Sequence, residues 1–435
     1  MKIGVDISAL QTGHRRRGIG SVVSNFINFL PKETRQQHSF VFYALPDEEK
    51  SLKVKEALKL LNLEGLNYEI SFVEAPAQSE SRRLPIFLRL PLKIFKRTVE
   101  LGRFNIGTKL PNHDLDVYLH TDQSLSLPRT GKAKKVMIAY DIIPYVMEWD
   151  YLWSYRTARL KGLSVQSAVR CRLRRWLYIS KLKSNIRRAN GLLAISEHTK
   201  NDLQKFLGTP AHKITVTPLG VVAPKYKSDT SPKLKRYYRT SWGYLPRSFQ
   251  LDTKEPFILF VGGADRRRRL EDLVTAFNQI RAEDKSLKLI LAGDSMQGPE
   301  NISTLEIQNS LKASSYLDDI IFLGFVDEAT RDWLYKNTKA FIYPSTYEGF
   351  GLPVLEAMIH GSPVICYKNG AVKEIAGNRP IYVSNHEELR QSLNKILAAS
   401  DQELNSIRQQ NIAHGQKFSW DKTSKDIMAV IEKLA

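Results

Sequence analysis

The sequence predicts an α/β protein built from two doubly wound, Rossmann-like parallel sheets, one in each half of the chain. Short apolar runs typical of strands buried on both faces alternate with amphipathic helical segments through both halves. The 435 residues are enough for two or three ordinary domains. We therefore expect a first domain over 1–222, a Pro-, Ser- and Lys/Arg-rich connection over 223–255, a second domain over 256–418 and a closing helix over 419–435 that returns to the first domain.

The amino-acid composition limits the kinds of partner that this protein is expected to bind. The formal net charge of +20 predicts an anionic partner, which could be nucleic acid, an anionic membrane or a phosphorylated small molecule. No recognition helix, RNP-like strand or zinc spacing is present, so we expect no nucleic acid. Two cysteines do not make a disulfide framework, and no apolar run approaches the roughly 18 residues of a membrane span. These features, with the absence of a secretory signal, favour a cytoplasmic protein.

In the first half, apolar runs of strand length alternate with helical patterns. The expected strands are Lys2–Leu10, Ser39–Leu45, Tyr68–Val73, Asp116–Leu119, Val136–Tyr140 and Leu192–Ile195, and the expected helices are Ser21–Leu30, Lys50–Leu61, Val169–Ala189 and Glu197–Leu207. Ser196 is a suitable N-cap for the last of these helices. The run Ile214–Val221 reads as a strand and turn that close the first domain.

The second half repeats the alternation. The expected strands are Phe257–Val261, Leu287–Ala292, Ile320–Leu323, Ala340–Tyr343 and Pro363–Cys366, and the expected helices lie near Ser303–Ser314, at Asp327–Asn337 and at Trp420–Leu434. We also expect a helix between the last two strands of the sheet, with Pro353 at its first position and Gly361 just past its end.

The turn before that helix is the best candidate for a ligand site. Gly349–Gly351 leads into a helix N-terminus, where unpaired N–H groups and the positive end of the helix dipole attract phosphate or sugar oxygens. Glu348 on the turn and Glu356 in the helix are suited to vicinal hydroxyls, because each carboxylate accepts two O–H donors. The alternative is a structural turn with two surface glutamates.

Two basic glycine-rich loops are further candidates for phosphate binding. Gly262-Gly263 and four successive arginines, Arg266–Arg269, follow a strand, and guanidinium groups bind phosphate oxygens in bidentate fashion. The loop Gly13–Gly20 has a similar character, but it lacks the third glycine of a dinucleotide fingerprint. For both loops, the alternative is a turn with solvated arginines.

These motifs resemble the family 4 retaining glycosyltransferases, which have the GT-B fold of two Rossmann-like domains facing each other across a cleft. The family pattern is Glu, then Gly-Phe-Gly-Leu-Pro, then a second Glu, matched here by Glu348, Gly349–Pro353 and Glu356. The resemblance covers nearly the whole chain and is strongest over Phe257–Ile375. Arg267–Arg269 stand where the family has Arg-Lys-Asn.

The resemblance implies roles for individual residues. The residues it implies for catalysis are Glu348, Arg267, Arg268, Tyr140 and Asp141. Those it implies for holding a nucleotide-sugar donor are Gly18, Gly20, Gly263, Phe325, Val326, Ser345, Gly349, Phe350, Gly351, Leu352 and Glu356. Two of the arginines would neutralise the diphosphate leaving group in place of a metal ion, so neither a metal nor a cofactor is expected. The acceptor would be a saccharide or a polyprenyl-linked saccharide.

Two features leave alternatives open. Tyr140 stands where the family has a histidine near the reacting sugar, so a transferase-like binding subunit without turnover remains the rival to an enzyme. A glycoside hydrolase is a poor fit, because its carboxyl groups must flank the glycosidic bond. The triplet Asp114–Asp116 reads as a turn before a strand rather than a metal site.

The stretch Arg82–Arg103 is both basic and apolar, and it contains Pro85 and Pro91. It is either a membrane-surface element or an ordinary helix with solvated charges, and the net charge favours the former. We therefore expect a cytoplasmic protein that can associate peripherally with the inner face of an anionic plasma membrane.

Overall fold

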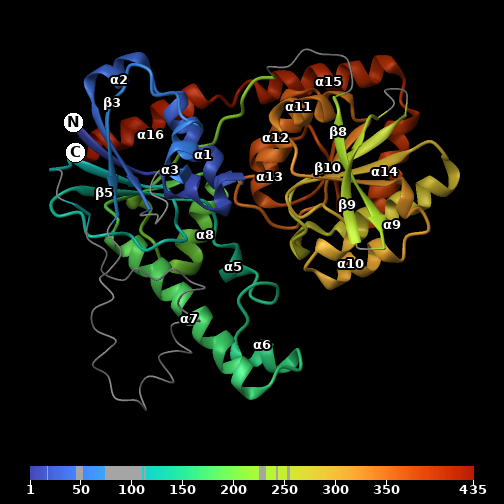
Figure 1. Cartoon of the computed structure of the whole chain (residues 1–435), viewed down its shortest axis with the longest axis horizontal. Coiled ribbons are helices and arrows are strands. Elements are labelled where there is room, and N and C mark those ends of the chain that lie inside the picture. Colours follow the sequence, from blue (N-terminus) through green and yellow to red (C-terminus); the bar gives the residue numbers. More distant parts are fainter. Residues whose placement is uncertain are drawn as a thin grey trace. The chain divides into compact units, whose positions relative to one another are not determined.

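The computed structural model describes residues 1–16, 18–45, 52–73, 110–111, 114–224, 232–241, 243–251 and 255–435. They form two compact units, one of Met1–Leu219 with Trp420–Ala435 and the other of Gly220–Ser419. Each unit is a parallel sheet with helices around it (Figure 1). The prediction of two doubly wound α/β sheets is therefore confirmed.

The sheet of the first unit has seven parallel strands in the order β3-β2-β1-β4-β5-β6-β7. Its strands are β1 (Lys2–Asp6), β2 (Ser39–Ala44), β3 (Asn67–Phe72), β4 (Val117–His120), β5 (Lys134–Ala139), β6 (Gly191–Ala194) and β7 (Ile214–Val216). The chain runs outward from β1 to β3 and then returns to β4 on the other side of β1. The carboxyl ends of β1 and β4 are therefore the topological switch point, where such sheets bind ligands.

The helices of this unit are α1 (Gly18–Asn28), α2 (Lys32–Gln37), α3 (Leu52–Leu58), α5 (Ile143–Val146), α6 (Tyr155–Leu160), α7 (Val165–Arg188), α8 (Glu197–Leu207) and α16 (Trp420–Leu434), with short 3-10 helices η1 (Ser8–Gln11), η2 (Gly13–Arg16) and η4 (Ala211–Lys213). The Ser196 side chain accepts a hydrogen bond from the Thr199 backbone N–H at the start of α8, as predicted.

The segment Gly13–Gly20 is more regular than the expected loop. Gly13–Arg16 is a 3-10 helix, and Gly18 and Gly20 lie in the first turn of α1, so their role in donor binding stays a prediction. The glycine at 20 has a packing role, since a Cβ there would lie 2.6 Å from the carbonyl oxygen of His14. It allows η2 and α1 to approach closely.

The sheet of the second unit has six parallel strands in the order β12-β11-β10-β13-β14-β15. Its strands are β10 (Phe257–Val261), β11 (Lys288–Ala292), β12 (Ile320–Gly324), β13 (Ala340–Tyr343), β14 (Val364–Tyr367) and β15 (Ile381–Val383). The helices are α9 (Leu270–Glu283), α10 (Leu305–Lys312), α11 (Glu328–Asn337), α12 (Leu352–Ile359), α13 (Gly370–Ala376), α14 (His386–Ala398) and α15 (Asp401–Gly415), with 3-10 helices η5 (Arg266–Arg268), η6 (Pro299–Asn301) and η7 (Leu317–Asp319).

The range expected to be a connection, 223–255, contains an antiparallel hairpin of β8 (Leu234–Thr240) and β9 (Gly243–Phe249). The hairpin packs on β12, the edge strand of the second sheet. The Tyr244 ring meets the Phe322 ring edge-on at 5.9 Å between centroids, and a Cβ at Gly324 would lie 2.8 Å from the ring of Tyr237. The hairpin thus covers an otherwise unpaired sheet edge.

The last helix, α16, belongs to the first unit although it follows the second in sequence. Its buried side chains include Trp420, Ile427, Met428 and Ile431, and the Ser424 hydroxyl donates to the carbonyl of Phe26 on α1 at 3.1 Å. Both chain termini lie in this unit, and α16 runs beside α1 (Figure 1).

Candidate functional site

Strands β10 and β13 are neighbours at the switch point of the second sheet. The chain leaves β10 toward β11 and β12 and then returns to β13 on the other side. Segments that follow these two strands therefore meet at one place on the carboxyl edge of the sheet. One segment carries the arginines of η5, and the other carries Glu348.

Glu348 is buried and accepts hydrogen bonds from three side chains. The donors are a guanidinium N–H of Arg267, the hydroxyl of Tyr343 at 2.7 Å and the hydroxyl of Ser345 at 2.9 Å. The same Arg267 nitrogen also donates to the carbonyl of Tyr347 at 3.0 Å. Arg267 is itself buried, so it is a partner of Glu348 and not a solvated charge.

The pKa of Glu348 lies below its ordinary value. Burial alone would raise this pKa, but the charges of Arg267 and Arg268 and the hydrogen bonds from Tyr343 and Ser345 lower it by more. Glu348 is therefore a carboxylate at neutral pH, held in one orientation by its donors.

Arg268 lies beside this pair and keeps donor capacity. Its Nε is 3.5 Å from the Glu348 carboxylate, and its guanidinium lies 5.7 Å from the centroid of the Tyr343 ring. That Nε is buried and makes no hydrogen bond within the part of the chain that the structure describes. A Cβ at Gly262 would come within 2.2 Å of the Arg268 guanidinium, so only glycine leaves room for this side chain. The arrangement leaves Arg268 able to bind an anion.

The glycine-rich turn has the predicted form. Gly351 is the N-cap of α12 with φ of 102°, and Pro353 lies in the first turn, one position later than expected. A Cβ at Gly351 would lie 2.8 Å from the side chain of Val372. Phe350 is buried and its ring meets that of Phe418 edge-on, so what it can offer a ligand is its backbone. Gly349 precedes it, and Leu352 begins the helix.

Glu356 has partners of its own on α11. Its two carboxylate oxygens lie 3.2 Å from the hydroxyl of Tyr335 and 3.7 Å from a guanidinium nitrogen of Arg331. The charge of Glu356 is the main cause of a raised pKa at Arg331. Each carboxylate oxygen has a second lone pair, so Glu356 can still accept sugar hydroxyls. Arg331 and Tyr335 were not predicted from the sequence, and only their spacing on a facing helix could have indicated them.

The remaining residues predicted for the second unit surround this edge of the sheet. Ser345 is fully buried, and its carbonyl accepts a hydrogen bond from the Asn369 side chain at 2.8 Å. Gly263 accepts a hydrogen bond from Arg268 at 3.3 Å. Phe325 follows β12 and is 49% exposed, and Val326 is next to it.

In the first unit, Tyr140 and Asp141 follow β5. The Tyr140 side chain is 6% exposed, and its hydroxyl has no hydrogen-bond partner among the described residues. Burial, with smaller contributions from Asp122 and Asp6, raises its pKa well above the ordinary value, so the phenol stays neutral. The Asp141 carboxylate accepts from the backbone N–H of Ile143 at 3.0 Å and thus shapes the turn into α5.

A polar cluster beside Tyr140 was not predicted from the sequence. Asp6 ends β1, His120 ends β4 and Asp122 follows it, and all three side chains are buried. His120 Nδ1 is 3.4 Å from the Asp6 carboxylate, and its Nε2 is 3.3 Å from the carbonyl oxygen of Leu125, which can only accept. The feature that could have indicated these three residues in the sequence is their position, because each lies at the carboxyl end of a strand at the switch point.

The triplet Asp114–Asp116 has a structural role, because the Asp116 carboxylate accepts a hydrogen bond from the backbone N–H of Lys2 at 2.7 Å. The stretch 82–103 lies outside the described residues. Among the helices that the structure describes, none is long and apolar enough to cross a membrane.

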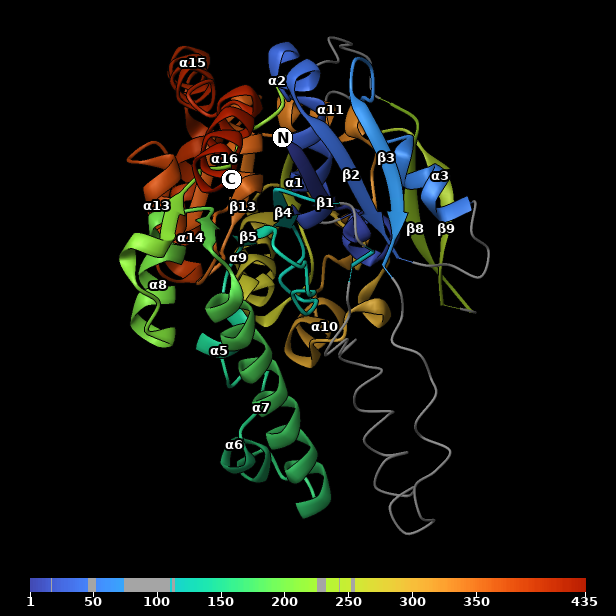
Figure 2. The same cartoon turned by 90° about the vertical axis from the view of Figure 1, so that its left-hand side faces the viewer.

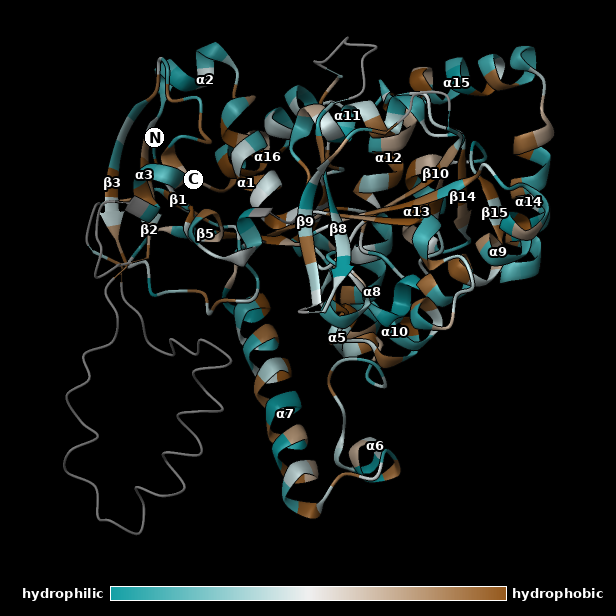
Figure 3. Cartoon of the chain, turned by 45° about the vertical axis from the view of Figure 1, so that its right-hand side comes forward, coloured by the Kyte–Doolittle hydropathy of each residue, from teal (hydrophilic) through white to brown (hydrophobic). Residues whose placement is uncertain are grey.

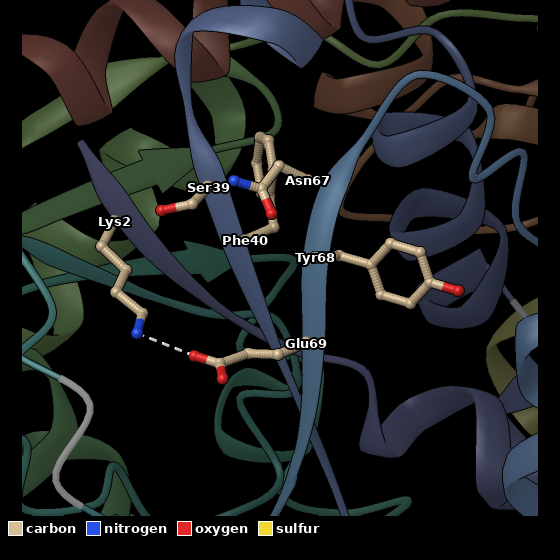
Figure 4. Close-up of a pocket in the computed structure, with 6 residues that line it drawn as sticks. All are labelled: Lys2, Ser39, Phe40, Asn67, Tyr68 and Glu69. Atoms are coloured by element: carbon tan, nitrogen blue, oxygen red, sulfur yellow. Dashed lines mark ion pairs between the residues drawn. The ribbon is translucent and has the colours of Figure 1, made fainter.

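A pocket of about 300 Å³ lies elsewhere, at the amino ends of β1, β2 and β3 (Figure 4). It is lined by Lys2, Ser39, Phe40, Asn67, Tyr68 and Glu69, and Lys2 pairs with Glu69 at 2.8 Å. It is at the opposite edge of the sheet from the polar cluster of Asp6 and Tyr140, so it is not the predicted site.

Comparison with known proteins finds a family match for most of the second unit. Residues 245–415 match the family model described as glycosyl transferases group 1. The O-antigen chain mannosyltransferase B of Escherichia coli is 25% identical over 250 residues, which are 56% of this chain and 61% of the relative. The MMP alpha-(1->4)-mannosyltransferase of Mycolicibacterium hassiacum is 28% identical over 272 residues, 60% of this chain and 58% of the relative. The chain thus spans about three fifths of the length of these relatives.

Solved structures extend the likeness to the fold of the whole chain. Anabaena Alr3699/HepE, solved in complex with UDP-glucose, aligns with a TM-score of 0.60 at 14% identity and covers 100% of both chains. Sucrose-phosphate synthase from Thermosynechococcus elongatus aligns with a TM-score of 0.62 at 16% identity, over 100% of this chain and 99% of the other. The chain therefore has the GT-B fold, and its residues 245–415 match the group 1 glycosyl transferases.

Proposed function

We propose that this chain is a retaining glycosyltransferase that moves a hexose from a UDP- or GDP-linked donor to a saccharide or lipid-linked saccharide acceptor. Mannose is the first candidate for the hexose, because several relatives of the chain are named mannosyltransferases. The names of the O-antigen relatives favour a role in cell-surface polysaccharide or glycolipid synthesis.

The observation that carries the proposal is the cluster of Arg267, Arg268 and Glu348 at the switch point of the second sheet. A nucleotide-sugar presents a diphosphate next to a polyhydroxylated ring, and it needs cations and acceptors side by side. Arg268 would stabilise the charge that develops on the leaving diphosphate, and the oriented Glu348 carboxylate would accept sugar hydroxyls. Glu356 would bind the ribose hydroxyls.

On the first unit, we assign the acceptor and the reacting sugar to the cluster around Tyr140. Its neutral phenol can donate a hydrogen bond but is a poor base, so the acceptor proton would pass to the leaving phosphate. The rival function, a transferase-like subunit that binds without turnover, is favoured by the same residue, because Tyr140 replaces the histidine of the resembled family.

The test has a binding step and a transfer step. A thermal-shift screen against UDP-, GDP-, ADP- and dTDP-linked sugars identifies the donor, since a ligand at about 100 times its Kd adds roughly 2.7 kcal/mol of stability. Transfer from that donor to lipid-linked and free saccharides, with the anomeric configuration read by NMR, then tests activity and retention. Donor binding without transfer to any acceptor would favour the binding subunit, and no binding at all would refute both.

A further inference from the structure

A helical hairpin projects from the first unit beyond its sheet (Figures 2 and 3). We call residues 148–188, which include α6 and α7, the α6–α7 hairpin. Internal contacts hold it in shape. Glu148 pairs with Arg175 of α7 at 3.0 Å and accepts from the Thr157 hydroxyl of α6 at 2.9 Å. Arg175 also donates to the carbonyl of Leu152 at 3.1 Å. The hairpin is therefore a preorganised element, and Glu148 is used internally to fix α6 against α7.

The hairpin exposes apolar side chains to an unusual extent. Six of the thirteen large hydrophobic side chains that are exposed in the described part of the chain lie within it, between Trp149 and Trp176. On α7, Val165, Val169 and Trp176 are all more than half exposed. These residues and the half-buried Leu173 are spaced i, i+4, i+8 and i+11, so they share one helix face. Such a contiguous apolar stripe indicates an interaction surface.

The charge of the hairpin specifies the partner. Residues 148–188 contain eleven Lys and Arg residues and two acidic residues, Glu148 and Asp150, so the hairpin carries a net charge of +9 of the formal +20 of the chain. On the helical wheel, Arg172 borders one side of the apolar stripe, Arg170 lies beyond the other side, and Arg174 lies further round the helix. All three are exposed. A surface with this charge selects an anionic partner.

The apolar stripe and the basic residues together favour a lipid surface over other anionic partners. A nucleic acid or a polyanionic saccharide would use the arginines, but it would leave the exposed aliphatic side chains Leu160, Val165 and Val169 in water. An anionic bilayer accepts both, because the apolar stripe enters the acyl boundary while flanking basic side chains extend to the headgroups. Lys161 lies 4.4 Å from the centroid of the Trp153 ring, and such Trp and Lys groupings are typical of the membrane interface.

We propose that the α6–α7 hairpin binds the surface of a bilayer that contains anionic lipids. The face defined by Val165, Val169, Leu173 and Trp176 inserts at the headgroup boundary, and Arg170, Arg172 and Arg174 contact the lipid phosphates. This proposal goes beyond the transferase function and does not depend on it, because vesicle binding requires neither donor nor acceptor.

The first experiment is co-sedimentation of the full chain with vesicles of phosphatidylglycerol and phosphatidylcholine, and with phosphatidylcholine alone, at low and high salt. The charge variant is Arg170→Glu, Arg172→Glu and Arg174→Glu. The matched control is Lys285→Glu, Lys395→Glu and Lys417→Glu, three exposed residues of the second unit with the same change in net charge. Circular dichroism verifies that both variants are folded.

We expect salt-sensitive binding of the wild-type chain to the anionic vesicles only. The charge variant should bind about 100-fold more weakly, roughly five-fold for each arginine, and the control should bind much more tightly than the charge variant. Absence of binding to anionic vesicles, or equal binding by the two variants, overturns the proposal. So does binding that is lost on reversal of Arg89, Lys93, Lys96 and Arg97 but kept in the charge variant.

A second pair of variants distinguishes a bilayer from a polyanion. Val165→Ser with Val169→Ser removes apolar side chains from the stripe without changing charge, and Leu305→Ser is its control on the second unit, where Leu305 is 63% exposed. We expect several-fold weaker vesicle binding for the stripe variant alone. Quenching of tryptophan fluorescence by brominated lipids should also fall in Trp176→Phe. If the charge variant loses binding while the stripe variant and the quenching are unchanged, the surface is a polyanion site and the bilayer proposal is refuted.

Discussion

At the scale of single residues, two adjacent arginines have different surroundings and should respond differently to mutation. Arg268→Ala removes a cation with a free donor, so donor affinity should fall at least about ten-fold while the fold is kept, since a charge-assisted hydrogen bond contributes about 1.5–3 kcal/mol. Arg267→Ala leaves Glu348 buried without its main partner, which costs about 3–5 kcal/mol of stability. Calorimetric titration and urea unfolding measure the two effects. Equal loss of stability in both variants would contradict this division.

Glu348 should make the stability of the protein depend on pH in the acid range. Its pKa is lowered in the folded state, so unfolded chains bind the proton first. The stabilisation is complete above the unfolded pKa of about 4.3 and is lost as the pH falls through the lower folded pKa. Glu348→Gln removes this dependence. The difference in unfolding free energy between wild type and variant should therefore shrink on acidification. If the unfolding free energies of the two proteins instead change in parallel with pH, Glu348 is not the cause of the pH dependence.

Tyr140→Phe tests the role of the unpartnered hydroxyl. Deleting a buried hydroxyl that has no partner should leave stability unchanged or raise it by about 1 kcal/mol. If the hydroxyl contacts the reacting sugar or the acceptor, turnover falls while donor affinity changes little. Thermal unfolding, donor titration and initial rates on one preparation separate these effects. Full activity in the variant would make Tyr140 a packing residue.

At the scale of elements, the turn before α12 depends on one glycine. Gly351 combines a φ of 102° with close contact to Val372. Gly351→Ala should therefore cost more than the roughly 0.5–1 kcal/mol typical of a glycine replaced without a clash. Donor affinity should fall with it, because the N–H groups of Gly349–Leu352 move. Gly131→Ala is the matched control, since its φ is 60° and no atom lies within 4 Å of the added Cβ. Similar donor affinity in both variants would show that the turn is not part of the site.

Elements with strong apolar periodicity could be predicted from the sequence almost to the residue. Phe257–Val261 and Ala340–Tyr343 were expected as strands and are β10 and β13, because burial on both faces demands continuous apolar runs. The hairpin β8–β9 was missed because its exposed basic and polar residues resemble a linker. Gly20 was interpreted as a loop residue because its close neighbour, η2, is a tertiary contact that sequence does not display.

Prediction of the candidate site from the sequence is limited in the same way, because tertiary contacts are not visible in the sequence. The sequence indicates Glu348, Glu356 and the arginines through their spacing from glycine turns. It does not indicate that Arg267 is buried against Glu348 or that Arg331 pairs with Glu356, because those contacts join segments 81 and 25 residues apart. Asp6 and His120 come together only through the strand order of the first sheet.

At the scale of the whole molecule, the C-terminal helix α16 returns to the first unit and completes its hydrophobic core. The side chains of Trp420, Ile427, Met428 and Ile431 on α16 are at most 2% exposed, and the helix packs on α1, β4 and β6. A buried side chain of this kind contributes about 1.5–3 kcal/mol, so these four contribute roughly 6–12 kcal/mol. That is comparable to the total stability of a domain, about 5–15 kcal/mol.

Deleting residues 420–435 should therefore unfold the first unit and leave the second folded. Hydrogen exchange should become fast in β1, β4 and β6 while β10, β13 and β14 stay protected. Calorimetry should lose one transition, and the nucleotide-sugar should still stabilise the transition that remains, because Arg268, Glu348 and Glu356, which are proposed to hold the donor, lie in Gly220–Ser419. The double variant Lys425→Ala and Lys433→Ala, at exposed positions of the same helix, is the control and should keep both units folded. Protection of β4 and β6 in the truncated chain at wild-type levels would show that α16 is dispensable for the first core.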